Sequence, residues 1–550
     1  MHHTNFPGPV ALTQGDRIRP AAMAARLATI LVAAIVGTTL IAGLIVGAQR
    51  DDSSGPVDLI VHNAKVYVAD DLGSMADAVA IRGNKILKVG SEREIMRYRR
   101  PQTTVLDARG AAVLPGFDDA HASVVAGGLA TEALQLHGAA SGDDIRERLE
   151  AFAEAHPDAS WIIGYGWSAD AVAEPTRALL DSVVSDRPVT LLSADGRALW
   201  VNSRALAKAG VSRRTVAPKN GLVVRDRRGD ATGILRDEAM ALVERVAPKP
   251  TREERARGLE LAIREAQRRG ITSVQDLGAT AGDLDLYDAA REAGTLGVRV
   301  YAALPAGTPA GDLEAINRRF PNDPLLKTGL ATLSLGGSAP VSSSLLVDLV
   351  SRGWQLALEA STEEAVREAI AAIAAVTTNS KGQKPARHRI EGLTLVDSDD
   401  MPRFGTLGIV ASLQPLHSAA PLTSWARALG PDRAALGWPA HSLSAAGAHL
   451  AFGSDWPRLP LDPLASLRAA VERDELQAAE QLTLKSAVNA WTSGAAWASF
   501  DDHRKGTIKA GMLADLVVLS TDIFASREKL KSAEVIITVF DGKIVYRRPS

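Results

Sequence analysis

Short apolar runs near both ends of the chain share one pattern. The runs at residues 59–70, 78–91, 103–116, 505–520 and 535–549 are rich in β-branched residues, alternate in part with polar ones, and stop at Gly, Asn or Asp. This pattern is typical of strands in a small antiparallel sheet. Because it begins and ends the chain around a different middle, we expect residues 57–113 and 504–548 to form one composite β-sandwich domain.

The middle of the chain alternates apolar runs with helical patterns. The runs include residues 271–278, 298–304, 354–360 and 449–457. Helical periodicity separates them, for example over residues 361–376, which begin Ser-Thr-Glu-Glu as a capped helix does. Alternating strands and helices predict an α/β fold with a parallel sheet, and a (β/α)8 TIM barrel with insertions fits residues 114–503.

One N-terminal segment differs from both patterns. Residues 27–48 contain no charged side chain. As a helix they would be about 33 Å long, enough to cross a bilayer core. Their 22 residues exceed the roughly 7–15 apolar residues of a secretory signal, so we favour an uncleaved transmembrane anchor over a cleaved signal peptide.

The charges around this segment predict its orientation. Arg17, Arg19 and Arg26 precede it, and basic residues favour the cytoplasmic side. We therefore expect a cytoplasmic tail at residues 1–26, a single-pass anchor in the lipid bilayer, a linker at 49–56, and an extracytoplasmic barrel.

Composition excludes several classes of function. The formal net charge is -2 and no basic stripe is apparent, so we expect no nucleic-acid partner. Cysteine is absent, which excludes disulfides, thiolate catalysis and zinc–thiolate sites. Any metal would have to be held by imidazole and carboxylate groups.

Eight ordered strings carry a resemblance to a known family. They are AVAIRGNKILKVG, VLPGFDDAH, LWVNSRALAKAG, ATGILRDEA, ITSVQDLG, RFGTLGIVASLQPLH, LAFGSDWP and GMLADLVVLS. Together they resemble the amidohydrolase superfamily, most closely its family 3, whose members include N-substituted formamide deformylase. The resemblance runs from about Val57 to Tyr546. It implies a distorted TIM barrel plus a β-sandwich built from both chain ends, and a small amide-like substrate.

The resemblance also implies a metal centre at the barrel mouth. The family binds one or two divalent ions through a His-x-His pair, a carboxylated lysine, two more histidines and an aspartate. Such an ion lowers the pKa of a bound water, and the aspartate takes its proton as it attacks a carbonyl carbon.

Most of these ligands are replaced in this chain. His121 matches the first histidine and Asp455 the aspartate, while the Asp of the family's Asp-Gly pair after the lysine strand aligns with Gly336. Four of six ligand positions have changed, namely Ser123, Thr332, Glu359 and Gly392. Threonine cannot form a lysine carbamate and glycine has no side-chain donor, so a binuclear centre is not expected.

Two further residues are expected at the substrate pocket. Arg197 stands where the family has a histidine in an Asp-Gly-His string, and it would either favour an anionic group or pair with Glu359 or Asp455. His417 ends the string LQPLH and either lines the pocket or lies outside it.

Three interpretations remain open at this point. The first is a pseudoenzyme or binding module descended from hydrolases of non-peptide C–N bonds, without a cofactor. The second is an active hydrolase with a single zinc-like ion on His121, Glu359 and Asp455. The third is a metal-free enzyme with Asp455 as base and Arg197 as an electrostatic clamp.

Overall fold

The computed structural model describes residues 56–549, apart from 170, 173, 321–322, 337–341, 379–385, 420–425, 427–428 and 474. Residues 57–550 form one compact unit. The anchor expected at residues 27–48 lies outside the described residues. Among the residues that are described, no helix has the length and apolar character needed to cross a membrane.

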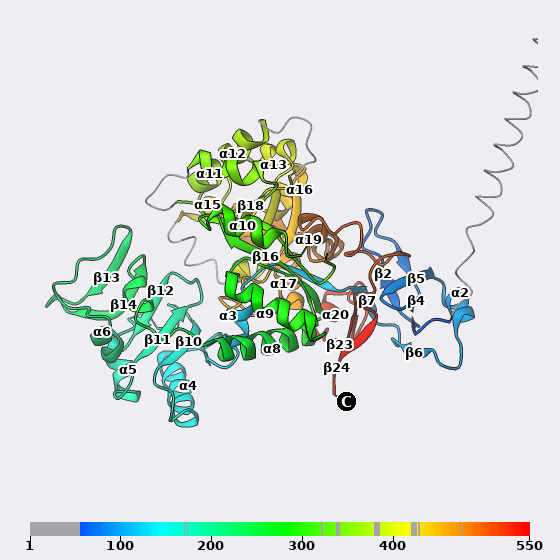
Figure 1. The fold of residues 1–550 in the computed structure, drawn as a ribbon. Helices are drawn as coiled ribbons and strands as arrows, with labels where there is room; N and C mark the ends of the chain where they lie inside the picture. The colour runs from blue at the N-terminus through cyan, green and yellow to red at the C-terminus, as the bar shows by residue number, and fades with distance from the viewer. Residues whose placement is uncertain are drawn as a thin grey trace, which may run out of the picture. The chain divides into compact units, whose positions relative to one another are not determined.

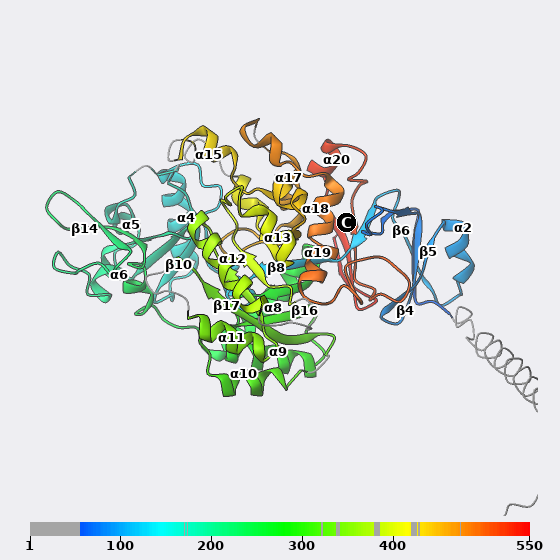
Figure 2. The same cartoon turned by 90° about the horizontal axis from the view of Figure 1, so that it is seen from above.

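Eight parallel strands form the central barrel (Figures 1 and 2). In spatial order they are β21 (His449–Phe452), β20 (Val410–Leu413), β19 (Arg389–Glu391), β18 (Gln355–Glu359), β17 (Leu326–Ser334), β16 (Arg299–Pro305), β15 (Ile271–Asp276) and β8 (Phe117–Ala122). A parallel bridge between Ala122 and Trp456 brings the two outer strands together. The predicted TIM-like barrel is therefore confirmed as a nearly closed one.

Helices lie between successive barrel strands and, after β21, in the C-terminal part of the chain (Figure 2). They are α3 (Val124–Ala130), α8 (Arg252–Arg268), α9 (Ala281–Glu292), α10 (Ala310–Asn317), α11 (Ser343–Ser351), α12 (Glu363–Thr378), α13 (Met401–Leu407), α15 (Pro431–Ala435), α16 (Ala440–Ala445), α17 (Pro463–Val471), α18 (Leu484–Ala490), α19 (Ser493–Ala498) and α20 (Arg527–Lys531). Helix α8 begins at a capping box of Thr251 and Glu254. Its buried side chains, such as Leu259, pack in one large core with strand residues such as Ile271.

Strands from both ends of the chain pair beside the barrel. One sheet has the order β24 (Lys543–Arg547), β23 (Val535–Phe540), β22 (Leu516–Leu519), β7 (Ala112–Pro115), β2 (Lys65–Tyr67) and β3 (Met75–Ala76). The other has the order β5 (Lys85–Gly90), β4 (Ala78–Arg82), β1 (Leu59–His62) and β6 (Thr104–Asp107). Strand β7 runs antiparallel to β22, which joins the first and last parts of the fold. Val61, Val79 and Leu516 share one buried cluster between the sheets.

A further sheet is inserted between β8 and β15 (Figure 1). Its order is β13 (Gly221–Arg225), β14 (Ala231–Asp237), β12 (Ala198–Val201), β11 (Val189–Ser193), β10 (Ile162–Trp167) and β9 (Leu134–Gln135). It carries α4 (Gly142–Ala155), α5 (Arg177–Val183), α6 (Ser203–Lys208) and α7 (Ala241–Glu244). The insert has its own core, which includes Leu180, Leu191 and Trp200. The turn between β11 and β12 carries Arg197.

Candidate functional site at the barrel mouth

The carboxyl ends of the parallel strands bring several polar side chains to one mouth. His121 lies near the end of β8, Glu359 ends β18 and Glu391 ends β19. His417 belongs to the short helix η3 (Pro415–Ala419) after β20, and Asp455 follows β21. Chemistry in barrels of this type is located at this end of the strands.

His121 is buried between two carboxylates. Its Nδ1 lies 2.8 Å from Glu391 Oε2, and its Nε2 lies 3.6 Å from Asp455 Oδ1. Burial lowers the pKa of His121, but the hydrogen bond with Glu391 and the charges of Glu391, Asp455 and Glu359 outweigh it and raise the pKa to about 9. The side chain is therefore an imidazolium at neutral pH, positioned to neutralise both carboxylates.

Asp455 contacts the end of β8 and lies beside three basic side chains, those of His121, His417 and Arg458. Its backbone N–H donates to the carbonyl of His121 over 2.8 Å, and its own φ of +60° is in the left-handed region. His417 Nε2 lies 2.9 Å from Asp455 Oδ2, and Arg458 Nη1 lies 3.8 Å from the same oxygen. Burial raises the pKa of Asp455, but the His417 hydrogen bond and the charge of His121 bring it below its ordinary value.

Glu391 is a site residue that the sequence reasoning did not select. It is fully buried, and its Oε1 lies 2.6 Å from Arg389 Nε, an ion contact in which the N–H does not point at the oxygen. Arg389 also donates through Nη2 to the carbonyl of Ala120 over 2.6 Å. Burial raises the pKa of Glu391, but Arg389 and His121 together lower it. The string IEG could have indicated Glu391, because its glutamate matches the glutamate of the family's Ile-Glu-His string, while Gly392 stands at the histidine position.

Asp119 is a second residue that the sequence did not select for the site. Its carboxylate accepts from the Ser454 N–H at 2.9 Å, the Ser454 hydroxyl at 2.5 Å and the His121 N–H at 3.1 Å. Burial raises its pKa to about 6. Asp119 therefore fastens the end of β8 to the loop that presents Asp455.

Of the four changed ligand positions, only Glu359 carries a side chain of a type that readily binds a metal ion. Ser123 precedes α3, and a Cβ on Gly278 would lie 2.4 Å from its hydroxyl oxygen. Thr332 donates to the carbonyl of Leu304 over 3.3 Å. Glu359 is half-buried and accepts a 2.6 Å hydrogen bond from Ser334.

Gly392 has a backbone conformation that favours glycine. Its φ is +70°, a region that L side chains rarely adopt, and a Cβ there would meet no atom within 4 Å. Gly336, aligned with the family's aspartate, is also left-handed, with φ of +79°. Space for a ligand side chain is present at Gly392, but the backbone no longer presents one without strain.

The residues at the mouth do not fit the family's metal centre. Across the described part of the chain, no group of three or more His, Asp or Glu side chains is placed to hold a metal ion. His417 contacts Asp455 directly, and both His121 nitrogens face carboxylates. The side chains at the mouth therefore bind one another in place of a family-type metal centre.

Arg197 does not pair with Glu359 or Asp455 as one expectation had it. Its side chain is 74% exposed, and its Nε lies 3.1 Å from Asp237 Oδ1, at the end of neighbouring strand β14. Strand pairing within the insert places Asp237 across from Arg197, and the Arg197 guanidinium forms an ion pair with this neighbouring carboxylate. Arg458 is instead the arginine beside Asp455. The turn that holds Arg197 does approach it, because a Cβ on Gly196 would lie 2.9 Å from Arg458 Nε.

Comparisons with known proteins agree with this architecture. A model of the amidohydrolase family matches residues 104–546. The chain is 30% identical over 534 residues to the Arabidopsis thaliana protein LONG AFTER FAR-RED 3, covering 89% of this chain and 91% of that protein. It is 27% identical to N-substituted formamide deformylase from Arthrobacter pascens, covering 89% of this chain and 98% of that enzyme.

A solved structure has the same fold. An uncharacterised metal-dependent hydrolase from Pyrococcus horikoshii superposes with a TM-score of 0.67 at 21% identity, covering 86% of this chain and 99% of that one. Since the family model spans most of the chain, the predicted family is confirmed. This chain belongs to amidohydrolase family 3.

Proposed function

We propose that this protein binds a small amide-like molecule at the barrel mouth and has lost the metal-dependent hydrolysis of C–N bonds that its family performs. The observation that carries the proposal is the direct contact of His417 with Asp455, beside His121 held between Asp455 and Glu391. Side chains of the protein itself thus surround the carboxylate that would otherwise bind a metal and receive a proton.

The chemistry of the changed positions supports this loss. A metal-activated water needs an ion with several fixed ligands and one open position. Ser123 and Thr332 contribute neutral hydroxyls, and Gly392 contributes no side chain. Neither hydroxyl replaces an imidazole or a carbamate, because a neutral hydroxyl is a weak donor to a zinc-like ion.

The same mouth retains groups suited to recognising an amide. His417 is 27% exposed and Arg458 53%, so each has a polar face toward solvent beside Asp455. A guanidinium and an imidazole can donate hydrogen bonds to an amide carbonyl or to a carboxylate on the same molecule. The Arthrobacter relative, named for its action on N-substituted formamides, favours a ligand of this class.

One observation favours a second candidate function, hydrolysis with a single divalent ion. His121 Nε2 and Asp455 Oδ1 are 3.6 Å apart, and the charge of Glu359 acts on the same imidazole. Deprotonation of His121 would give Nε2 a free lone pair, which could bind a metal ion together with the carboxylates of Asp455 and Glu359. This alternative requires Glu359 to leave Ser334 and His417 to leave Asp455.

We also propose that residues 27–48 attach the protein to a membrane, with the barrel on the extracytoplasmic side. The support is the uncharged length of that segment and the arginines before it. Protease added to spheroplasts should then digest the barrel. Complete protection of the barrel would show that the orientation is reversed.

Metal content and turnover of the purified full chain test the main proposal. After zinc supplementation we expect well under one metal per chain and no hydrolysis of a panel of N-substituted formamides, with weak binding of some of them. Asp455→Asn should not change metal content, and Asp143→Asn, an exposed residue of α4, serves as the charge-matched control. One metal per chain that is lost only in Asp455→Asn, together with turnover, would establish the single-ion hydrolase instead.

A further inference from the structure

Four exposed arginines gather in the β-sandwich part of the chain, before the first barrel strand β8. They lie on α2 (Glu92–Ile95), on the following 3-10 helix η2 (Met96–Tyr98), and in the turn after it. All four side chains are exposed. We call Arg93, Arg97, Arg99 and Arg100 the arginine patch.

The arginine patch has no neutralising carboxylate within the described part of the chain. The two acidic residues of α2 are already engaged, since a carboxylate oxygen of Glu92 lies 3.0 Å from His62 Nδ1 and one of Glu94 lies 3.2 Å from Lys88 Nζ. Arg100 Nη1 donates only to backbone carbonyls, those of Arg97 at 3.0 Å and Arg99 at 2.8 Å. A cluster of arginines without counter-charges is expected to attract an anion from outside the fold.

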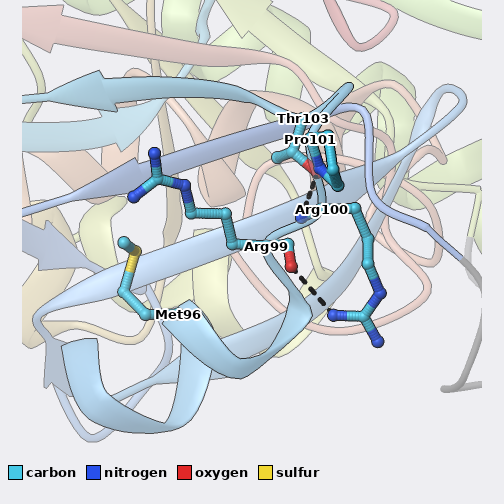
Figure 3. Close-up of a pocket in the computed structure, with 5 residues that line it drawn as sticks. All are labelled: Met96, Arg99, Arg100, Pro101 and Thr103. Carbon is cyan, nitrogen blue, oxygen red and sulfur yellow. Dashed lines mark hydrogen bonds between the residues drawn. The ribbon is translucent and has the colours of Figure 1, made fainter.

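The patch borders a concavity of about 450 Å³ (Figure 3). Arg99 and Arg100 line it with Pro101 and Thr103, and Met96 adds an apolar side chain. The Arg100 N–H donates to the Thr103 hydroxyl over 3.0 Å, which holds the turn in shape. A guanidinium presents its N–H donors in a fork, and the oxygens of a phosphate group accept hydrogen bonds in the matching geometry. The arginines that line this concavity are therefore suited to bind a phosphate group.

This turn is fastened to the first described residues of the chain. The Thr103 hydroxyl donates to the carbonyl of Val57 over 2.8 Å, and the Thr104 N–H donates to the carbonyl of Asp58 over 2.9 Å. Ile95 packs in one buried cluster with Val57. Eight residues lie between Ala48, the end of the expected anchor, and Val57, so the chain between them spans at most about 30 Å.

From these observations we propose that the arginine patch binds the phosphate headgroups of anionic phospholipids and so docks the β-sandwich on the membrane surface. The inference rests on the proposed membrane attachment and is independent of the chemistry at the barrel mouth. The short segment between the expected anchor and Val57 would keep the patch close to the membrane. Lipid headgroups would therefore have a higher effective concentration at the patch than free phosphate in solution. Each arginine near an anionic surface contributes roughly fivefold to binding.

The absence of cysteine allows a direct test. Gln102→Cys, at an exposed position beside the patch, gives the full chain a single site for an environment-sensitive fluorophore. The labelled protein is reconstituted in nanodiscs of phosphatidylcholine alone or with one third phosphatidylglycerol, each carrying a headgroup-linked quencher. We expect strong quenching only in the anionic nanodiscs, and its loss at high salt, because added ions screen charges at the surface.

Two matched variants complete the test. Replacing all four patch arginines with glutamine should reduce the quenching at least tenfold. Replacing four exposed arginines of the insert in the same way should leave it unchanged; these are Arg214, Arg227, Arg228 and Arg236. Equal quenching in neutral and anionic nanodiscs, or equal effects of the two variants, would overturn the proposal. Failure of the membrane attachment would appear differently, as a full chain that enters no nanodisc of either composition.

Discussion

His417 Nε2 lies 2.9 Å from Asp455 Oδ2, so a histidine contacts the carboxylate that the family resemblance predicts as the metal ligand and proton acceptor. This contact joins η3, after β20, to the loop after β21. The carboxylate also faces His121 and Arg458. Asp455 is therefore contacted by basic side chains from three segments of this chain, namely β8, η3 and its own loop.

Asp455→Asn should lower the pKa of His121. The variant removes one of the two carboxylates that face the imidazole, while Glu391 remains. In the wild type the His121 ring should stay protonated through pH 8, because its pKa is raised to about 9. Histidine side-chain NMR over a pH series measures both titrations. An unchanged His121 titration in the variant would contradict the placement of Asp455 beside that ring.

His121 should make the free energy of unfolding decrease at alkaline pH. Its folded pKa of about 9 lies above the ordinary value of 6.5, so its contribution is complete below about pH 6.5 and is lost as pH rises through 9. The upper limit of this contribution is about 3 kcal/mol. Denaturant unfolding of the wild type should show the loss, and Glu391→Gln should flatten the curve over this range. A wild-type curve that is already flat would show that the carboxylates do not hold the imidazolium.

His388 should affect the pH dependence of stability in the opposite direction to His121. It is buried before β19, its Nδ1 accepts from the Leu356 N–H over 3.1 Å, and burial lowers its pKa to about 4. The unfolded chain binds this proton first, so stability falls as pH drops from about 6.5 toward 4, by at most about 3 kcal/mol. His388→Gln should make stability less sensitive to acid over this range. The same unfolding measurements report it, and an acid slope equal to that of the wild type would refute the assignment.

Substitutions at Gly392 should reveal left-handed strain rather than crowding. Its φ of +70° and the open space around it predict that Gly392→Ala costs about 1 kcal/mol of unfolding free energy. Gly392→Asn should cost less, because asparagine tolerates this conformation. Gly392→His, alone or with Ser123→His, should still bind less than one metal per chain, as measured by elemental analysis. A stoichiometric metal in the double variant would show that only those two ligands were missing.

Arg458→Gln should weaken binding of amides that carry a carboxylate more than binding of neutral amides. The guanidinium is half exposed beside Asp455 and can pair with a ligand anion. We expect about a tenfold loss of affinity for N-acyl amino acids by calorimetry. Arg197→Gln is the control, since Arg197 pairs with Asp237. Equal losses of affinity in the two variants would contradict the prediction that Arg458, and not Arg197, contacts the ligand.

The sequence by itself determined the family and the barrel, and the resemblance predicted which ligand positions differ. Ordered strings such as ITSVQDLG and LAFGSDWP mark individual strand ends, and a strand end depends on a few consecutive residues. His121 and Asp455 are brought to one mouth because the ends of parallel strands meet there. The absence of donors at Ser123, Thr332 and Gly392 is a matter of residue type alone.

Only the tertiary structure decided which side chains meet at that mouth. The contact of His121 with Glu391 joins residues 270 positions apart, on strands β8 and β19 that are not neighbours in the barrel. One expectation paired Arg197 with Glu359 or Asp455, but strand pairing within the insert gives it Asp237 as its ion-pair partner. The partner of a charged side chain depends on distances set by strand order and side-chain rotamers. Those distances arise only when segments far apart in the sequence pack together.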